Sequence, residues 1–313
     1  MISIITDKSD YQKQVDLAAT FRNTIGTKHI TLFDQPITLY DDPWMWHLHV
    51  KLTNACNAKC SFCVEQGDAT KNNPAKLLEN LDVMLREMKT KGILHSVSVT
   101  GGEPTIYPYF REVCLILQKY DIPFVTLNTN GALVHKYLKI IDETFHFIDV
   151  SRHRLTDSAN NSVFQTTVPS IADLQSIRSV LTKCKMRIQC VLDVNTSIEF
   201  FKSFCDVYAF ADDLSFRRLM KLEQQTYDVD EDGYRRLLDY CLENYTFRQQ
   251  VIQDYYVYEI YNNGQTDITF SYSDMKLLLQ QEQYEADNKV REFILHPNGI
   301  VSKSWKQTSL LLG

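Results

Sequence analysis

One short segment sets the architecture of this chain: Leu52-Thr-Asn-Ala-Cys56-Asn-Ala-Lys-Cys60-Ser-Phe-Cys63. Its three cysteines follow the spacing C-x3-C-x2-C on a single loop, close enough together to bind three corners of one metal cluster. A cubane [4Fe–4S] cluster ordinarily has four cysteine ligands, so three ligands leave one iron open to bind another molecule. We therefore expect Cys56, Cys60 and Cys63 to hold a [4Fe–4S] cluster that serves catalysis rather than simple electron transfer.

A zinc site is the alternative interpretation of the same cysteines. Structural zinc takes four ligands, and the sequence has no second close cysteine pair to supply the fourth. His47 and His49 are nearby, but they precede the loop on an expected strand and would have to fold back to reach the metal. A zinc-binding interaction module on a degenerate barrel, with one zinc and no catalytic role, remains the alternative from a different functional class.

The order of strands and helices around the loop predicts an α/β fold. Between residues 46 and 220, β-branched runs alternate with segments of helical periodicity, which is typical of βα units and a parallel sheet. Polar or glycine-rich segments follow these strands: Gly101-Gly-Glu-Pro104, Asn128-Thr-Asn-Gly131, Val150-Ser151 and Ile188-Gln-Cys-Val191. Parallel sheets bind ligands at the carboxyl ends of their strands, so these segments are expected to share one site with the cysteine loop.

The cysteine loop and the four later segments, in this order, resemble those of radical S-adenosylmethionine (SAM) enzymes. The resemblance implies a partial (βα)6 TIM-like barrel over residues 46–220. We expect residues 1–45 to form a short N-terminal appendage, with Asp34-Gln-Pro36 as a hairpin turn. Residues 221–313, rich in Tyr and Gln, are expected to form a C-terminal α+β cap that binds substrate.

The resemblance also implies an activity and its cofactors. An enzyme of this family uses a [4Fe–4S] cluster to cleave SAM reductively to methionine and a 5′-deoxyadenosyl radical, which abstracts hydrogen from a substrate. The electron would come from a flavodoxin- or ferredoxin-type reductant. The resemblance does not identify the substrate, the bond that changes, or whether SAM is consumed or regenerated.

Several residues are expected to contact SAM because they match family positions. Glycine permits close backbone approach to a ligand, Glu103 would contribute to binding the SAM amino group, and Arg187 would pair with the SAM carboxylate. For Phe62 the alternative is core packing, and for Thr129 and Asn130 it is a plain polar turn. The full set comprises Phe62, Gly101, Gly102, Glu103, Thr129, Asn130, Ser151, Arg187 and Gln189.

Five further residues are candidates for substrate binding. Many relatives have Ser-Leu-Asp after the fourth strand, whereas this chain has Ser151-Arg-His-Arg154, which predicts a positively charged mouth. The sixth strand carries two adjacent arginines, one of which should point inward by alternation. These candidates are Arg152, His153, Arg154, Arg217 and Arg218, with Asn195 as a weaker one.

Composition limits the partners. The chain has 313 residues, 44% hydrophobic and 23% charged, with a net charge of −6, which gives no electrostatic case for nucleic acid or an anionic membrane. Eight cysteines without a pairing pattern and no apolar run of membrane-spanning length favour a soluble cytoplasmic enzyme. We favour a peptide substrate, because a Tyr-rich strand edge could pair with an extended chain. The alternative is a nucleotide, nucleoside or sugar phosphate bound by the arginines.

Overall fold

The computed structural model of the chain describes residues 3–5, 25–63, 71–193, 196–219, 231–253, 256–273, 289–290, 292–303, 305 and 310–312. Asn195 and residues 6–24 of the expected N-terminal appendage lie outside these residues. Among the described residues, no helix is both long enough and apolar enough to cross a membrane.

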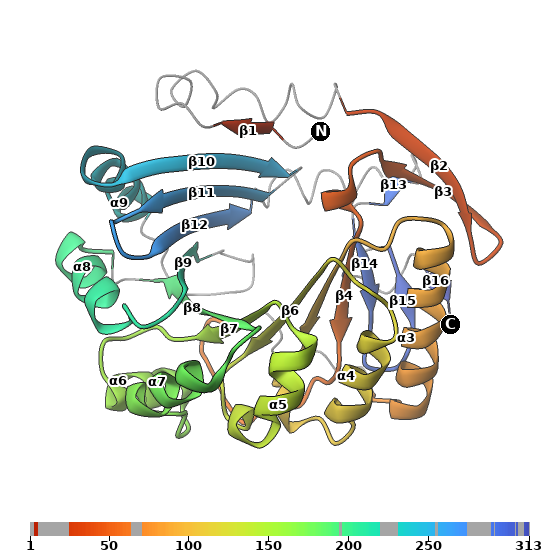
Figure 1. Cartoon of the computed structure of the whole chain (residues 1–313), viewed down its shortest axis with the longest axis horizontal. Coiled ribbons are helices and arrows are strands. Elements are labelled where there is room, and N and C mark those ends of the chain that lie inside the picture. Colours follow the sequence, from red (N-terminus) through yellow and green to blue (C-terminus); the bar gives the residue numbers. More distant parts are fainter. Residues whose placement is uncertain are drawn as a thin grey trace.

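Six parallel strands, each followed by a helical segment, form the centre of the molecule (Figure 1). The strands are β4 (His47–Lys51), β5 (Ser96–Thr100), β6 (Phe124–Thr129), β7 (Phe147–Ser151), β8 (Lys185–Leu192) and β9 (Asp213–Arg218). The helices are α3 (Pro74–Thr90), α4 (Phe110–Gln118), α5 (Val134–Thr144), α6 (Asp157–Phe164), α7 (Ile171–Val180) and α8 (Ile198–Val207). The predicted parallel barrel is therefore confirmed, with the helices on the outer side of the curved sheet.

Local sequence explains the ends of the first helix. Pro74 occupies the first turn of α3, and the Asn73 side chain caps it by accepting a hydrogen bond from the Lys76 backbone N–H. Gly92 follows the helix with a φ of 65°, the left-handed conformation that glycine adopts readily. In contrast, α6 was not predicted, because its sequence Asp-Ser-Ala-Asn-Asn-Ser-Val-Phe has little apolar periodicity.

The sheet continues on both sides of the six strands. The described residues form a 13-stranded sheet in the order β1-β10-β11-β12-β9-β8-β7-β6-β5-β4-β14-β15-β16. The added strands are β1 (Ser3–Ile5), β10 (Thr246–Gln253), β11 (Tyr256–Asn262), β12 (Asp267–Ser273), β14 (Phe293–Leu295), β15 (Val301–Ser302) and β16 (Leu310–Leu312). Helix α9 (Glu231–Asn244) precedes β10. The described C-terminal segments therefore extend the barrel sheet at both of its edges.

The N-terminal hairpin differs from its prediction in one detail. Strands β2 (Thr27–Leu32) and β3 (Gln35–Tyr40) pair with β13 (Lys289–Val290) in a small second sheet, next to the short helix η1 (Pro43–Met45). The turn lies at Phe33 and Asp34, whose φ values are 51° and 60°. A two-residue hairpin turn needs positive φ at both positions, so the turn precedes the expected Asp34-Gln-Pro36, and Pro36 lies within β3.

Alternation along the strands separates an apolar outer face from a polar inner face. Val50, Val99, Leu127 and Val150 are fully or almost fully buried in the hydrophobic core. The intervening residues point to the inner face and are mostly polar: His49, Ser98, Asn128, Asp149, Ser151, Arg187, Gln189, Asp213, Ser215 and Arg217. The inner face at the carboxyl ends of the strands is therefore where a ligand can meet polar groups.

Candidate active site

The cysteine loop leaves the carboxyl end of β4 and brings three thiols into one neighbourhood. Cys56 is exposed, whereas Cys60 and Cys63 are half-buried. Burial, together with the nearby charges of Cys63 and Cys56, raises the pKa of Cys60 to about 12. Thiols that disfavour one another's ionisation need cations to become thiolates, and the irons of a cluster provide them.

The loop supplies three thiols, one for each of three irons of a cubane cluster. A structural zinc needs four ligands, each about 2–2.3 Å from one centre. A cubane instead binds each thiolate at a different iron. The Ala58 backbone N–H also donates to Cys56 Sγ at 3.3 Å, a type of hydrogen bond that tunes iron–sulfur ligands.

Gly101 and Gly102 hold the cysteine loop against the end of β5. The Gly102 N–H donates to Thr53 O at 2.6 Å, and the Glu103 N–H donates to Ala55 O at 2.9 Å. A Cβ added at Gly102 would lie 2.6 Å from the Ala55 carbonyl carbon, and one at Gly101 would lie 2.6 Å from Thr53 O. The glycines therefore permit close approach to the cysteine loop itself, a contact that the sequence analysis did not foresee.

The Glu103 carboxylate is buried and accepts hydrogen bonds from neighbouring protein groups. Its Oε1 accepts hydrogen bonds from the Thr105 hydroxyl and the Thr129 hydroxyl, each at 2.6 Å. Oε1 also accepts from the Thr105 N–H at 3.0 Å, and Oε2 accepts from the Asn130 N–H at 2.7 Å. Burial raises the Glu103 pKa, while these hydrogen bonds oppose the rise. With only 1% of the residue exposed, the carboxylate binds protein groups, and its contribution to binding the SAM amino group stays a prediction.

Thr129 and Asn130 continue this junction at the end of β6. Thr129 Oγ1, which donates to Glu103, also accepts from the Gly131 N–H at 2.9 Å. Asn130 Nδ2 donates to Asn57 Oδ1 on the cysteine loop at 2.8 Å, and Asn130 Oδ1 accepts from the Ala132 N–H at 2.9 Å. Both side chains are thus used within the protein, in agreement with the alternative of a polar turn.

The structure does not support the predicted positive mouth at Arg152 and Arg154. Arg152 is 1% exposed, and its guanidinium donates to the carbonyl oxygens of Asn130 at 3.1 Å and Pro169 at 2.7 Å. Burial lowers the pKa of Arg152 to about 10, so it remains charged at neutral pH. Arg154 forms an ion pair with Asp193 at 2.6 Å. One arginine is therefore enclosed and the other is neutralised, so neither offers an open charge to a substrate.

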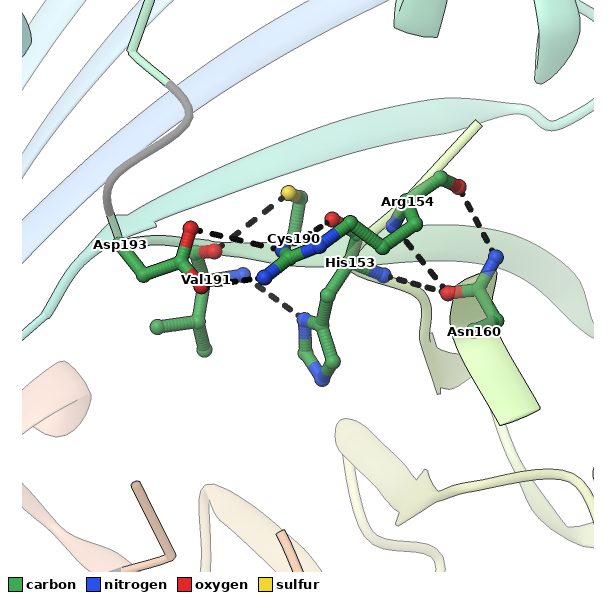
Figure 2. A network of polar contacts seen from close by, with 6 residues as sticks. All are labelled: His153, Arg154, Asn160, Cys190, Val191 and Asp193. Atoms are coloured by element: carbon green, nitrogen blue, oxygen red, sulfur yellow. Dashed lines mark hydrogen bonds and ion pairs between the residues drawn. The ribbon is translucent and has the colours of Figure 1, made fainter. Parts of the chain in front are cut away.

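His153 lies between these arginines and is a neutral hydrogen-bond donor. Its Nδ1 accepts the Val191 backbone N–H at 3.1 Å, which places the ring proton on Nε2. Figure 2 shows that the second ring nitrogen points away from this network. Burial, together with the charges of Arg154 and Arg152, lowers the His153 pKa to about 3. The ring meets the Phe62 ring of the cysteine loop edge to face at 5.0 Å, so His153 contacts the loop directly.

Arg187 is already paired with two carboxylates. It bonds Asp213 at 2.9 Å and Asp149 at 3.4 Å, and its guanidinium lies 4.5 Å from the centre of the Phe147 ring. Burial raises the Asp213 pKa to about 6, opposed by the charge of Arg187. The expected partner of Arg187 was the SAM carboxylate, but the available charge is taken up by Asp149 and Asp213.

Three predicted residues face inward and have no partner among the residues that the structure describes. The side chains of Ser151, Gln189 and Arg217 make no hydrogen bond or ion pair within the described part of the chain. Arg218 points to the opposite face, where its guanidinium lies 5.2 Å from the centre of the Tyr272 ring. Of the two adjacent arginines, Arg217 is therefore the inward one.

Other inward residues were missed by the sequence analysis. Asp149 and Asp213 flank Arg187, and Tyr258 and Ser271 lie beyond Arg217 on the next strands of the sheet. Asp149 lies two residues before Ser151 on the same strand, so the alternation of side chains along a strand could have identified it as inward-facing. Tyr258 and Ser271 lacked such a signal, because the sequence analysis placed their segment in a cap.

The two histidines of the zinc alternative lie at the amino-terminal half of β4. His47 bonds Ser96 at 2.7 Å and Ser98 at 3.0 Å. His49 bonds Ser98 at 2.7 Å and Glu292 at 2.8 Å. These contacts use every ring nitrogen of the pair, so the histidines do not complete a metal site with the cysteines.

Comparisons with known proteins agree with this geometry. Residues 50–163 match the family model of the radical SAM superfamily. GTP 3′,8-cyclase of Aquifex aeolicus is 29% identical over 126 residues, which are 39% of either chain. A probable GTP 3′,8-cyclase of Metallosphaera sedula is 30% identical over 110 residues, 35% of this chain and 34% of that protein. The chain thus aligns with less than half the length of these curated relatives.

Solved structures support the fold over a longer stretch. Streptococcus suis SuiB bound to S-adenosylmethionine superposes with a TM-score of 0.60 at 19% identity, covering 83% of this chain and 60% of SuiB. The anSMEcpe protein with bound AdoMet gives a TM-score of 0.57 at 16% identity, covering 85% of this chain and 77% of that one. The cysteine loop and the family-model match thus show a radical SAM domain over residues 50–163, and the cofactors of that family are a [4Fe–4S] cluster and SAM.

Proposed function

We propose that this chain reductively cleaves SAM at a cluster held by Cys56, Cys60 and Cys63 and uses the product to remove a hydrogen atom from a substrate. The bound cluster and SAM supply one-electron cleavage of the sulfonium, with release of methionine and transfer of a substrate hydrogen atom to the adenosyl C5′. The electron comes from a flavodoxin- or ferredoxin-type reductant. The observation that carries the proposal is the loop with three free thiols at the carboxyl end of β4, within the residues that match the radical SAM family model.

The protein residues around the loop position it rather than react. Glu103 and Asn130 connect the ends of β5 and β6 to the loop through hydrogen bonds. His153 packs against Phe62 from the end of β7. A loop fixed from three strands keeps the thiols in place when the cluster changes oxidation state, which supports the positioning that such chemistry needs.

The tyrosine-rich strand offers no free edge with which a peptide substrate could pair. The tyrosine-rich strand β11 is paired on both sides, by β10 and β12. Part of β10 is in turn covered by β1 of the same chain. An extended peptide therefore has no open edge at these tyrosines, and the inner face is a better place to seek the substrate.

The test is an anaerobic SAM-cleavage assay. The protein is reconstituted with iron and sulfide, mixed with SAM and dithionite, and 5′-deoxyadenosine is quantified by mass spectrometry. We expect product from the wild type and from the control Cys205→Ala, whose cysteine lies in α8 on the outer side, but none from Cys60→Ala. Product from Cys60→Ala, or one tightly bound zinc in place of the cluster, would contradict the proposal.

A further inference from the structure

Three side chains form a row across neighbouring strands on the inner face. Arg217 of β9 pairs in register with Ser271 of β12, and Ser271 pairs with Tyr258 of β11. Residues paired in this way share a face, and adjacent strands lie about 4.8 Å apart. The guanidinium, the hydroxyl and the phenol therefore lie side by side at the carboxyl end of β9, the end of the barrel from which the cysteine loop also departs.

None of the three side chains has a hydrogen bond or ion pair to another described residue. This distinguishes Arg217 from its inward neighbour Arg187, which bonds two carboxylates. Arg217 nevertheless lies near the inner face, because its charge opposes the burial-driven rise in the pKa of both Tyr258 and Asp149. A partly exposed arginine beside two hydroxyl-bearing side chains, with no ion pair to a described carboxylate, can bind a ligand of negative charge.

Two carboxylates deeper in the barrel determine which way such a ligand is oriented. Along β9, Asp213 lies four residues before Arg217 and bonds Arg187, which also bonds Asp149. This group of two carboxylates and one guanidinium carries a net negative charge when both acids are ionised, so it repels an anion. A ligand with one anionic end would place that end at Arg217 and extend the remainder along Gln189 and Ser151.

We propose that Arg217, Ser271 and Tyr258 form a subsite for an oxyanion group of the substrate, a phosphate or a carboxylate. The planar guanidinium fork matches two oxygens of either group, and the two hydroxyls donate to the others. That the ligand is the substrate rests on the proposed function; that the row binds an oxyanion does not. Neighbouring Arg218 provides a matched control, because it carries the same charge on the opposite face.

The experiment is titration calorimetry of reconstituted protein with SAM bound, so that the probe does not compete for the open iron. Pyrophosphate and succinate are the probes, and wild type, Arg217→Met and Arg218→Met are compared. We expect at least one probe to bind about ten-fold or more weakly to Arg217→Met, as the loss of a charge-assisted hydrogen bond implies, and equally to wild type and Arg218→Met. The probe that responds identifies the group as a phosphate or a carboxylate.

Two results would overturn the assignment. One is that neither probe binds the wild type at millimolar concentration, or that Arg217→Met binds as tightly as the wild type. The other is that Arg217→Met loses substrate-independent SAM cleavage, which would place Arg217 in the support of the cysteine loop. If the wild type itself makes no 5′-deoxyadenosine, the proposed function fails, but the anion titration still tests the subsite.

Discussion

The two halves of the barrel differ in how the polar groups at their strand ends are used. In the first half, Glu103 after β5 accepts four hydrogen bonds, and Arg152 after β7 is held by backbone carbonyls. From β8 to β11, by contrast, Gln189, Arg217 and Tyr258 have no partner among the described residues. The match to the family model ends at residue 163, so it covers the first half and not the second.

This difference separates a fixed support from a surface for binding. Buried polar groups that satisfy one another hold a unique geometry, and losing one partner leaves others exposed to a desolvation cost. Polar groups without protein partners add little to stability and can bind a ligand instead. We infer that the first half fixes the cysteine loop, whereas the second half determines which substrate is bound.

The largest effect is expected for Gly102→Ala. The new Cβ would lie 2.6 Å from the Ala55 carbonyl carbon, so the cysteine loop must move away from β5. We expect loss of the iron bound after reconstitution and of SAM cleavage, measured by iron analysis and 5′-deoxyadenosine formation. Gly26→Ala is the control, because its Cβ would have no neighbour closer than 3.8 Å. Normal iron content in Gly102→Ala would show that the loop does not depend on this contact.

Glu103→Gln should destabilise the protein strongly, although the two side chains have the same shape. An amide has one acceptor oxygen, so its NH2 group would face either the Asn130 N–H or the hydroxyls of Thr105 and Thr129. Leaving buried donors unsatisfied costs roughly 2–4 kcal/mol of unfolding free energy. Urea unfolding of the cluster-free protein measures this loss. The exposed control Glu112→Gln should change the unfolding free energy by less than about 0.5 kcal/mol, and equal losses in the two variants would contradict the support role.

His153 should make the first half sensitive to acid. Its folded pKa of about 3 is below the ordinary value of 6.5 because the ring is buried. Between these values the unfolded chain binds a proton that the folded protein does not, so the His153 contribution is present above pH 6.5 and is lost as the pH falls. Between these two pKa values the unfolding free energy falls by about 1.4 kcal/mol for each pH unit.

His153→Gln tests that slope, because an amide oxygen can still accept the Val191 N–H but does not titrate. We expect the unfolding free energy of the wild type to fall more steeply than that of the variant between pH 6.5 and pH 5, as measured by urea unfolding. Parallel pH profiles would mean that His153 is protonated in the folded protein and that the assignment of its proton to Nε2 alone is wrong.

The sequence predicted the support better than the binding surface, and the reason is physical. The cysteine loop and the strand ends carry dense local signals, so the barrel and the inward face of Arg217 could be predicted from spacing and alternation. The sequence does not distinguish Arg187 from Arg217, since both are arginines that alternation along their strands places on the inner face. Only the pairing of the strands reveals that Asp149 and Asp213 form ion pairs with Arg187. Strands of two or three residues, such as β15, carry no periodic pattern, which is why the sequence analysis did not identify the C-terminal strands as part of the barrel sheet.

The smallest change in unfolding free energy is expected for Tyr258→Phe, because its phenol has no hydrogen bond to lose within the described residues. The phenol makes no hydrogen bond to a described residue, so removing it should change the unfolding free energy by less than about 0.5 kcal/mol, in contrast to Glu103→Gln. The same substitution should weaken the affinity for the responding anion by about 2- to 10-fold, because one neutral hydrogen bond to the ligand is lost. Urea unfolding and calorimetry on one preparation measure both. A large loss of stability with unchanged anion affinity would instead assign Tyr258 to the support, and the two halves would then not differ in the way proposed.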